Sequence, residues 1–283
     1  MRPKKSDDKD AEPGVSYKLV DTRHGRFLAN PKDTYIGRAL IDYGEFSELE
    51  SQILLQLLPA GGTAVEVGAN VGAHTVALAR KAGARGRIYA YEPQPVIFQN
   101  LCANLALNGL TNVYPHNQAC GVAADRMRFP DINYGVMGNF GGVSLDMLPD
   151  VETGMMIDIV PLDSLGLRRC DLLKVDAEGM EQPVLDGARG LINACTPILY
   201  VENDRVEQSA ELIGTILQLG YRAWWHTPPY FNRDNFFKNP ENAWPGVVSI
   251  NMLCVPKTRK ANITGLAEIL SPDDRPERER PRT

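Results

Sequence analysis

The chain contains 283 residues, of which 43% are hydrophobic, and its formal net charge is −5. This apolar content is enough for one large core, or for one domain with an annex. The weakly acidic balance argues against a protein that coats nucleic acid or anionic lipid, and the lack of any apolar run of about 18 residues excludes a predicted membrane span.

Both ends of the chain are polar and charged. We expect disordered tails over residues 1–14 and, within a C-terminal segment 258–283, from about residue 271. The segment between the tails predicts an N-terminal cap over 15–60 and one main domain over 61–257. The N-terminus lacks the apolar core of a secretory signal, and the five cysteines are scattered without a CxxC pair. These features favour reduced thiols in a cytoplasmic protein.

The cap begins with a predicted hairpin, formed by Tyr17–Val20 and Gly25–Leu28. A helix is predicted over Ser47–Leu58, because its leucines recur at helical spacing. Ser47 and Glu50 are spaced as a capping box at the start of this helix. The sequence Pro59-Ala60-Gly61-Gly62 then ends it.

From Thr63 on, short apolar runs alternate with amphipathic stretches. Strands are predicted over Thr63–Val67, Arg87–Tyr91, Val113–His116, Asp171–Val175, Ile198–Val201, Tyr221–Trp225 and Val247–Val255. Helices are predicted over Ala73–Ala82, Pro95–Leu107, Glu181–Arg189 and Glu207–Leu219. This alternation is typical of a doubly wound α/β fold, with a mostly parallel sheet covered by helices on both faces. Asp125–Pro161 interrupts the alternation with a predicted strand at Met156–Val160, and we interpret it as an insertion beside the carboxyl ends of the strands.

The first informative motif joins the first predicted strand to its helix, with the sequence VEVGANVGAHT from Val65. Gly68 and Gly72 allow a tight turn and a close approach of backbone to a ligand. The spacing is neither G-x-G-x-x-G nor a Walker phosphate loop. Glu66 argues against a pyrophosphate and suits a ligand with a cationic end. Taken alone, the motif is equally compatible with an ordinary strand-turn-helix corner.

The second motif ends the next predicted strand. The run Ile88–Pro93 is apolar and delivers an acid, Glu92, 26 residues after Glu66. An ionised carboxylate at this strand tip accepts hydrogen bonds from both ribose hydroxyls of an adenosine ligand. The alternative is a solvated glutamate at a strand end. The two motifs together, at this spacing, favour the adenosine site.

Several segments closely resemble the FkbM family of S-adenosylmethionine (SAM)-dependent methyltransferases, which have the class I, seven-stranded, Rossmann-like fold. The segments are VEVGANVGAHTVALA, YAYEPQPVIFQNLCANLALNGLTNV, VPLDSL, DLLKVDAEGMEQPVLDGA and LYVEND, within Thr63–Asp204. The resemblance implies SAM as methyl donor and, as the usual reaction, O-methylation. It implies a sugar, glycan or polyketide-like small molecule as the acceptor, without choosing between them.

Family positions carry over to a predicted SAM site. The resemblance implies that Glu66, Gly68, Asn70 and Gly72 form the corner at the methionine end, that Glu92 holds the ribose, and that Asn117 or Gln118 contacts the adenine edge. For Asn117 and Gln118, a role as plain polar loop residues is about equally compatible with the sequence.

The third motif, LKVDAEGME from Leu173, contains Lys174, Asp176 and Glu178. Alternation places Lys174 and Asp176 on one face of the strand, where the lysine keeps the aspartate ionised. We rank a metal-free catalytic role first. Second is a Mg²⁺ site made by Asp176 with Glu202 at the end of the next strand, and third a purely structural network of buried acids.

A general base and an acceptor pocket are predicted near the end of the domain. His226 is the best candidate base among the histidines. The stretch 224–237 is unusually aromatic for a loop, as a sugar-binding rim is, but a loop that buries its rings fits equally well. Together with Asn139–Gly142, this stretch is the candidate acceptor pocket.

Two other classes of function compete with this hypothesis. An enzyme that binds NAD or a nucleotide sugar would need glycines at G-x-G-x-x-G spacing, and Asn70 and Val71 break that pattern. A non-catalytic SAM-binding protein of the same fold would be free to lose Glu92 or the Gly68 turn, and both are present. The sequence therefore favours the methyltransferase.

Overall fold

The apolar runs of the chain's middle form one twisted sheet in the computed structural model, which describes residues 14–145 and 151–276. Its strands are β3 (Thr63–Val67), β4 (Arg87–Tyr91), β5 (Val113–His116), β9 (Leu172–Val175), β10 (Ile198–Glu202), β11 (Tyr221–His226), β12 (Asn251–Pro256) and β13 (Glu268–Ile269). Within the described residues, these eight strands pair in the order β13-β11-β12-β10-β9-β3-β4-β5.

Strand directions confirm the predicted doubly wound, mostly parallel sheet. β5, β4, β3, β9 and β10 pair in parallel, and β12 runs antiparallel to both β10 and β11. The seven predicted strands are joined at the β11 edge by β13, a two-residue strand that the sequence did not indicate. The strand order reverses between β3 and β9, and ligands of open α/β sheets bind at such a point.

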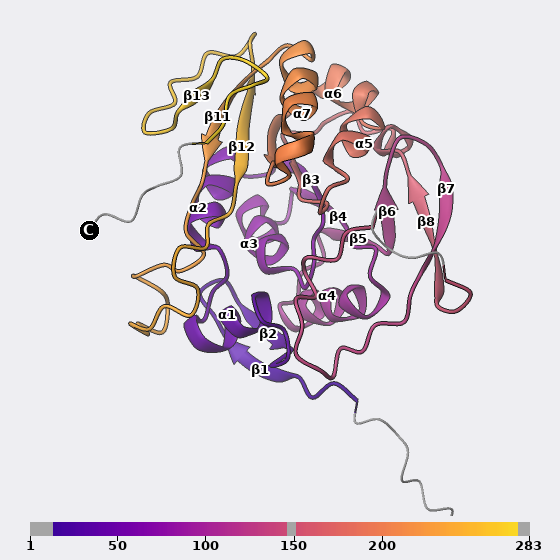
Figure 1. The fold of residues 1–283 in the computed structure, drawn as a ribbon, viewed down its shortest axis with the longest axis vertical. Helices are drawn as coiled ribbons and strands as arrows, with labels where there is room; N and C mark the ends of the chain where they lie inside the picture. The colour runs from indigo at the N-terminus through magenta and orange to yellow at the C-terminus, as the bar shows by residue number, and fades with distance from the viewer. Residues whose placement is uncertain (1–13, 146–150, 277–283) are drawn as a thin grey trace, which may run out of the picture.

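Helices cover both faces of the sheet (Figure 1). One face carries α2 (Glu48–Leu57), α3 (Ala73–Ala82) and α4 (Pro95–Leu107), and the other carries α5 (Glu181–Asp186), α6 (Arg189–Cys195) and α7 (Val206–Gln218). Alternation along β3 divides its residues between two cores, because Ala64 packs beneath α3 whereas Val65 and Val67 pack with α7. Glu66 therefore faces the α3 side.

The cap contains the predicted hairpin, β1 (Lys18–Asp21) and β2 (Arg26–Ala29), and a helix that we did not predict, α1 (Ile36–Tyr43). The prediction of a capping box at α2 is wrong, because the side chains of Ser47 and Glu50 bond to each other and not to the backbone. Ser47 has a left-handed backbone with φ 43°, and its hydroxyl donates to the Glu50 carboxylate at 2.6 Å. Within the described chain, its side chain caps no amide of the helix.

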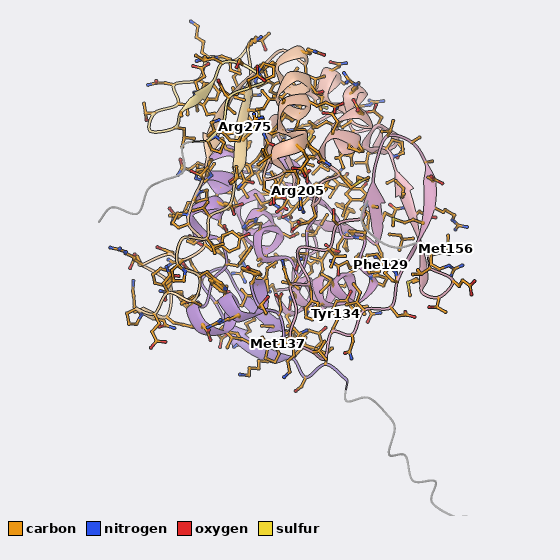
Figure 2. All side chains as sticks on the ribbon, viewed as in Figure 1. Phe129, Tyr134, Met137, Met156, Arg205 and Arg275 are labelled. Atoms are coloured by element: carbon orange, nitrogen blue, oxygen red, sulfur yellow. The ribbon has the colours of Figure 1, made fainter. Side chains whose placement is uncertain are left out.

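The insertion forms a small separate sheet. Its strands are β6 (Gln118–Cys120), β7 (Asp125–Phe129) and β8 (Met155–Val160), paired in the order β6-β8-β7, and a 3₁₀ turn, η1 (Leu162–Leu165), follows. Only β8 was predicted. Met156 lies on the outer side of the molecule, whereas Phe129 is buried and Met137 lies beside the cap (Figure 2). There the Gly138 carbonyl accepts from the amide of Thr34 at 2.9 Å.

Two predicted elements differ from the structure by more than one or two residues. The helix predicted over Glu181–Arg189 ends at Asp186 as α5, and a further helix, α6, begins at Arg189. The chain turns at Gly187, where an added Cβ would lie 1.9 Å from the Gly121 carbonyl oxygen. The predicted strand Val247–Val255 starts later, at Asn251. The preceding segment instead pairs with another loop, since the Ser249 amide donates to the Pro228 carbonyl at 3.0 Å.

The predicted tails fall mostly outside the described residues. Residues 1–13 and 277–283 are not described, so disorder at the two ends stays a prediction. Residues 271–276 are described, and there Asp274 accepts hydrogen bonds from the amides of Leu270 and Ser271. Among the described helices, none has the length and apolarity that a bilayer crossing requires.

Candidate active site

A cavity of about 250 Å³ opens at the carboxyl ends of β3, β4, β9 and β10. It is bounded by the sheet, by the cap and by two loops, one from the insertion and one between β11 and β12. Its lining includes Phe46, Glu50, Glu66, Gly68, Asn70, His74, Glu92, Gln118, Lys174, Asp176, Glu178, Glu202, Tyr230 and Ser249. The cavity thus lies at the switch point of the sheet.

The corner between β3 and α3 requires glycine. Gly68 has φ +79°, and a Cβ there would lie 1.7 Å from the carbonyl oxygen of Asp176. The amides of Gly68 and Ala69 both donate to the Tyr91 carbonyl, at 3.0 and 2.9 Å. Gly72 also has a positive φ, +89°, and an added Cβ there would lie 2.7 Å from Leu101. The corner is therefore locked against the neighbouring strands, with its backbone at the cavity wall.

Glu92 links the second strand tip to this corner. Its carboxylate accepts the Asn70 amide and the Gln94 amide, each at 2.9 Å. Burial raises its pKa to about 7, against the opposing effect of these two amides. Each carboxylate oxygen keeps a second lone pair, and the side chain lines the cavity. Glu92 is thus placed to accept hydrogen bonds from a diol.

Glu66 and Lys174 lie side by side in register on β3 and β9. The Glu66 carboxylate accepts the Thr75 hydroxyl at 2.6 Å. Burial raises the pKa of Glu66 to about 7, and the nearby Lys174 ammonium partly opposes that shift. Both side chains line the cavity. A carboxyl group with a pKa of about 7 is only partly ionised at neutral pH, so a bound ligand can change the charge of Glu66.

Lys174 and Asp176 form a buried ion pair. The Lys174 ammonium lies 2.9 Å from a carboxylate oxygen of Asp176. Burial opposes the charge of both groups, but their mutual attraction outweighs it, so the pKa of Lys174 is raised and that of Asp176 is lowered. Asp176 is therefore ionised at neutral pH, as the sequence predicted from the spacing of the two residues.

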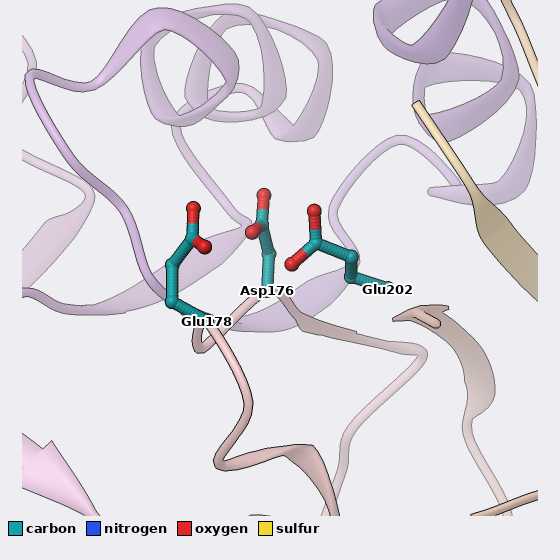
Figure 3. Close-up of side chains that lie close together, drawn as sticks. All are labelled: Asp176, Glu178 and Glu202. Atoms are coloured by element: carbon teal, nitrogen blue, oxygen red, sulfur yellow. The ribbon is translucent and has the colours of Figure 1, made fainter. Parts of the chain in front are cut away.

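Asp176, Glu178 and Glu202 point toward one another (Figure 3). One oxygen from each lies within 4.8 Å of the others, and Glu202 hydrogen-bonds to Asp176. Burial and the charge of Asp176 raise the pKa of Glu178 to about 8 and that of Glu202 well above its usual value. The three acids therefore share fewer than three negative charges at neutral pH. Their oxygens are hard donors of the kind that Mg²⁺ takes.

The structure separates the two candidate adenine contacts. Gln118 lines the cavity. Asn117 lies outside the described lining, and its amide donates to the carbonyls of Glu92 and Pro93, at 2.9 and 3.0 Å. Asn117 thus holds the chain after β4 in place.

His226 is also outside the described lining of the cavity. Its Nδ1 and the Tyr200 hydroxyl form a hydrogen bond of 2.8 Å on the buried face of the sheet. Burial lowers its pKa to about 4. Among the described residues, the histidine that lines the cavity is His74.

The cap and the β11–β12 loop complete the other half of the wall, the cap with residues that we did not predict as part of the site. From the cap come Phe46 and Glu50, and Glu50 hydrogen-bonds Ser249. From the loop, Tyr230 reaches the cavity and also hydrogen-bonds Ser249. For Glu50 the sequence does contain a signal of a role in the site, because this acid lies on the apolar side of a predicted helix.

The aromatic stretch 224–237 has two roles. Tyr230 lines the cavity, as a rim would. Phe231 instead packs with Tyr43 of α1, with ring centroids 5.4 Å apart, in a cluster that also contains Trp244. The other predicted rim, Asn139–Gly142, contributes Asn139, Gly141 and Gly142 to the wall.

Comparison with known proteins gives a family for this architecture. Residues 66–223, more than half of the chain, match the model of the methyltransferase FkbM domain. Methyltransferase sdnD of Sordaria araneosa is 29% identical over 191 residues, which are 52% of this chain and 72% of that protein.

Solved structures are similar at a lower level. Methyltransferase FkbM from Methylobacillus flagellatus KT has 17% sequence identity and a TM-score of 0.45 over 72% of this chain, which spans half the length of that protein. A putative O-methyltransferase from Klebsiella pneumoniae has 14% identity and a TM-score of 0.44 over 74% of this chain and 80% of that one. The family model, together with the strand order and the glycine corner, shows that this chain belongs to the FkbM family of SAM-dependent methyltransferases.

Proposed function

We propose that this methyltransferase transfers the methyl group of SAM to a hydroxyl oxygen of an uncharged acceptor, such as a sugar or a polyketide-like small molecule. The observation that carries the proposal is the charge of the cavity wall. Carboxyl groups of Glu50, Asp176 and Glu202 line it, and the only described lysine there, Lys174, is already paired. Such a wall hydrogen-bonds hydroxyls and, among the described residues, offers no unpaired lysine or arginine to a phosphate or carboxylate.

SAM would occupy the half of the cavity next to β3 and β4. Glu92 would accept the ribose hydroxyls, Gln118 would face the adenine, and the Gly68 corner would allow the methionine end to approach the backbone. Glu66 would lie near the cationic end. The fit rests on Glu92, whose free lone pairs face the cavity, and on the acidic groups around it. When bound, SAM supplies an electrophilic methyl group, whose bond to sulfur breaks as the new C–O bond forms.

Asp176 is the proposed base. Its ion pair with Lys174 keeps it ionised, so it has a lone pair ready for the proton that leaves the attacking hydroxyl. Lys174 positions that carboxylate. The neighbouring Glu178 and Glu202, whose pKa values are raised, can share or pass on the proton. The remaining task of the chain is to align the oxygen with the methyl carbon.

A Mg²⁺-dependent version uses the same residues. Asp176, Glu178 and Glu202 offer a cation three oxygens. We favour metal-free transfer because the Lys174 ammonium already neutralises Asp176 at 2.9 Å, and a divalent ion would have to bind beside that charge.

The test is transfer of labelled methyl from SAM to methyl glycosides, small alcohols, matched amines and cell extract, with and without EDTA. We expect label on oxygen, at a rate that EDTA leaves unchanged. Label found only on nitrogen or carbon would overturn the proposal, and activity that EDTA abolishes and Mg²⁺ restores would establish the metal-dependent version.

Thermal melting with SAM and with NAD separates the competing classes. A ligand that binds only the folded state raises the melting temperature by mass action. We expect SAM, and not NAD, to raise it. Tight SAM binding without transfer to any acceptor in extract would favour a non-catalytic SAM-binding protein.

A further inference from the structure

His74 is held rigidly at the cavity wall. It is the second residue of α3, only 7% exposed. Its ring stacks on Phe46 of the cap with centroids 6.1 Å apart. The ring also hydrogen-bonds the backbone of Ser47. Because Nε2 has no described partner, we assign the N–H of this bond to Nδ1. The cap thus holds the ring in place.

The other ring nitrogen has been left without a partner. Nε2 of His74 is buried and makes no hydrogen bond with any described residue. With the proton on Nδ1, Nε2 presents a lone pair. Buried acceptors are normally satisfied in folded proteins, and leaving one unpaired destabilises the fold. Because His74 lines the cavity, an unpaired acceptor on its ring points to a ligand that donates a hydrogen bond.

The electrostatics of the wall keep this acceptor available. Burial, and next the Lys174 ammonium, lower the pKa of His74 to about 3, while Asp176 and the Ser47 bond oppose the shift and His24 adds to it. The ring is therefore neutral throughout the physiological range, and Nε2 remains an acceptor. For the same reason it is a poor proton acceptor, so its role is to bind and orient.

Its surroundings place His74 on the side of the methyl acceptor. Phe46, against which it stacks, also packs edge-on against Tyr230, with centroids 5.7 Å apart. Tyr230 in turn hydrogen-bonds Ser249 in the loop that closes this half of the cavity. On its other side His74 follows the Gly68–Gly72 corner. The ring therefore lies where the corner meets the aromatic wall.

From these contacts we infer that His74 Nε2 accepts a hydrogen bond from a second hydroxyl group of the acceptor, beside the one that is methylated, and so orients the reacting oxygen. The inference rests on the proposed O-methylation. It adds no proton-transfer step, because the proton of the methylated hydroxyl leaves to Asp176.

Nitrogen NMR of ¹⁵N-histidine-labelled protein tests the contact without turnover. The protein is saturated with S-adenosylhomocysteine, which has no methyl group to transfer, and receives methyl β-glucopyranoside or, as a matched ring without hydroxyls, tetrahydropyran. We expect the glucoside, and not tetrahydropyran, to move the Nε2 resonance of His74. A shift caused by S-adenosylhomocysteine alone would make His74 a cofactor residue, and an Nε2 that no alcohol in the transfer panel moves would equally overturn the inference.

Variants provide the kinetic test, with the best methyl glycoside of the transfer panel as acceptor. His74→Phe keeps the ring but removes the lone pair, whereas His74→Gln keeps an acceptor atom near the position of Nε2. We expect His74→Phe to lower kcat/KM by about tenfold, His74→Gln to recover most of it, and both to bind SAM normally. Equal losses in the two variants would contradict the inference.

His116 is the matched control. Its Nε2 is also buried without a described partner, and its ring stacks on Tyr91 at 4.7 Å, but it lies outside the described lining of the cavity. His116→Phe should leave kcat/KM unchanged. If no alcohol is methylated although the glucoside moves Nε2, the proposed function fails and the His74 contact stands. If alcohols are methylated and His74→Phe does not slow their methylation, the proposed function stands and the inference about His74 fails.

Discussion

At the scale of single residues, the charge of each acid in the cavity depends on burial together with all of its charged neighbours. Asp176 stays ionised because Lys174 lies 2.9 Å away, whereas Glu178 has a pKa of about 8 because burial and Asp176 outweigh the Arg205 guanidinium at 3.0 Å. Neighbouring carboxyls with opposite pKa shifts are typical of sites that handle protons. The sequence predicted the Lys174–Asp176 pair from strand alternation, but the states of the other acids depend on burial.

Asp176→Asn tests the proposed base. The amide cannot take the hydroxyl proton, so turnover should fall by about 100-fold or more, while the affinity for SAM stays unchanged in calorimetry. Asp158→Asn is the control, since Asp158 forms an exposed ion pair with Arg126 on the insertion. Full activity of Asp176→Asn would remove Asp176 from the mechanism.

SAM affinity should depend on pH through Glu92. Its pKa is raised to about 7, and only the ionised form has lone pairs for both ribose hydroxyls. The Kd for SAM should therefore fall as pH rises from about 6 to 8, with Glu66, at a similar pKa, adding to the change. Glu92→Ala should weaken binding at every pH and flatten this dependence in calorimetric titrations. An unchanged Kd in Glu92→Ala would contradict the ribose assignment.

At the scale of elements, the strand-turn-helix units of the sheet were predictable, because their signals are local. The bounds of β3, α3, β4 and α4 coincide with those expected from periodicity and from glycine and proline positions. α1, α6, β6, β7 and β13 were not expected. All are short, and the backbone bonds of the three strands are made with distant segments, as when β13 pairs with β11.

The glycine corner between β3 and α3 gives a prediction at this scale. Gly68→Ala forces a Cβ against the Asp176 carbonyl, 1.7 Å away, at a φ of +79°. We expect a loss of about 2 kcal/mol or more in the free energy of unfolding, from denaturant titration, and weakened SAM binding.

Gly109→Ala separates strain from steric overlap. Gly109 also has a positive φ, +62°, but no described neighbour lies within 4 Å of an added Cβ. Its alanine variant should lose only about 1 kcal/mol and bind SAM normally. Equal losses at the two positions would show that the contact with Asp176 does not define the corner.

At the scale of the whole molecule, the cavity contains several carboxyl groups that are partly protonated at neutral pH. The pKa values of Glu66 and Glu92 are raised to about 7, and that of Glu178 to about 8, from an ordinary value of 4.5. A raised folded-state pKa gives stability that is complete below the unfolded value and is lost as pH rises through the folded value. SAM, which brings positive charge, should favour the ionised forms.

The melting temperature of the SAM-free protein should therefore fall as pH rises from about 5 to 8. The increase that SAM produces should be larger at the upper end of this range. Glu178→Gln should flatten the decline, because it removes the group with a pKa of about 8. A melting temperature that stays level over this range would show that these acids are already ionised in the folded protein.

The sequence by itself determined the sheet, the glycine corner and the acids at the strand tips, because each depends on periodicity or on residues adjacent in the chain. Only the tertiary structure decided which polar residues share the cavity. It places His226 beside Tyr200, and brings Phe46 and Tyr230, 184 positions apart in the chain, into contact around His74. The physical reason is that such contacts depend on how the cap and the loops fold over the sheet, and no local pattern records that packing.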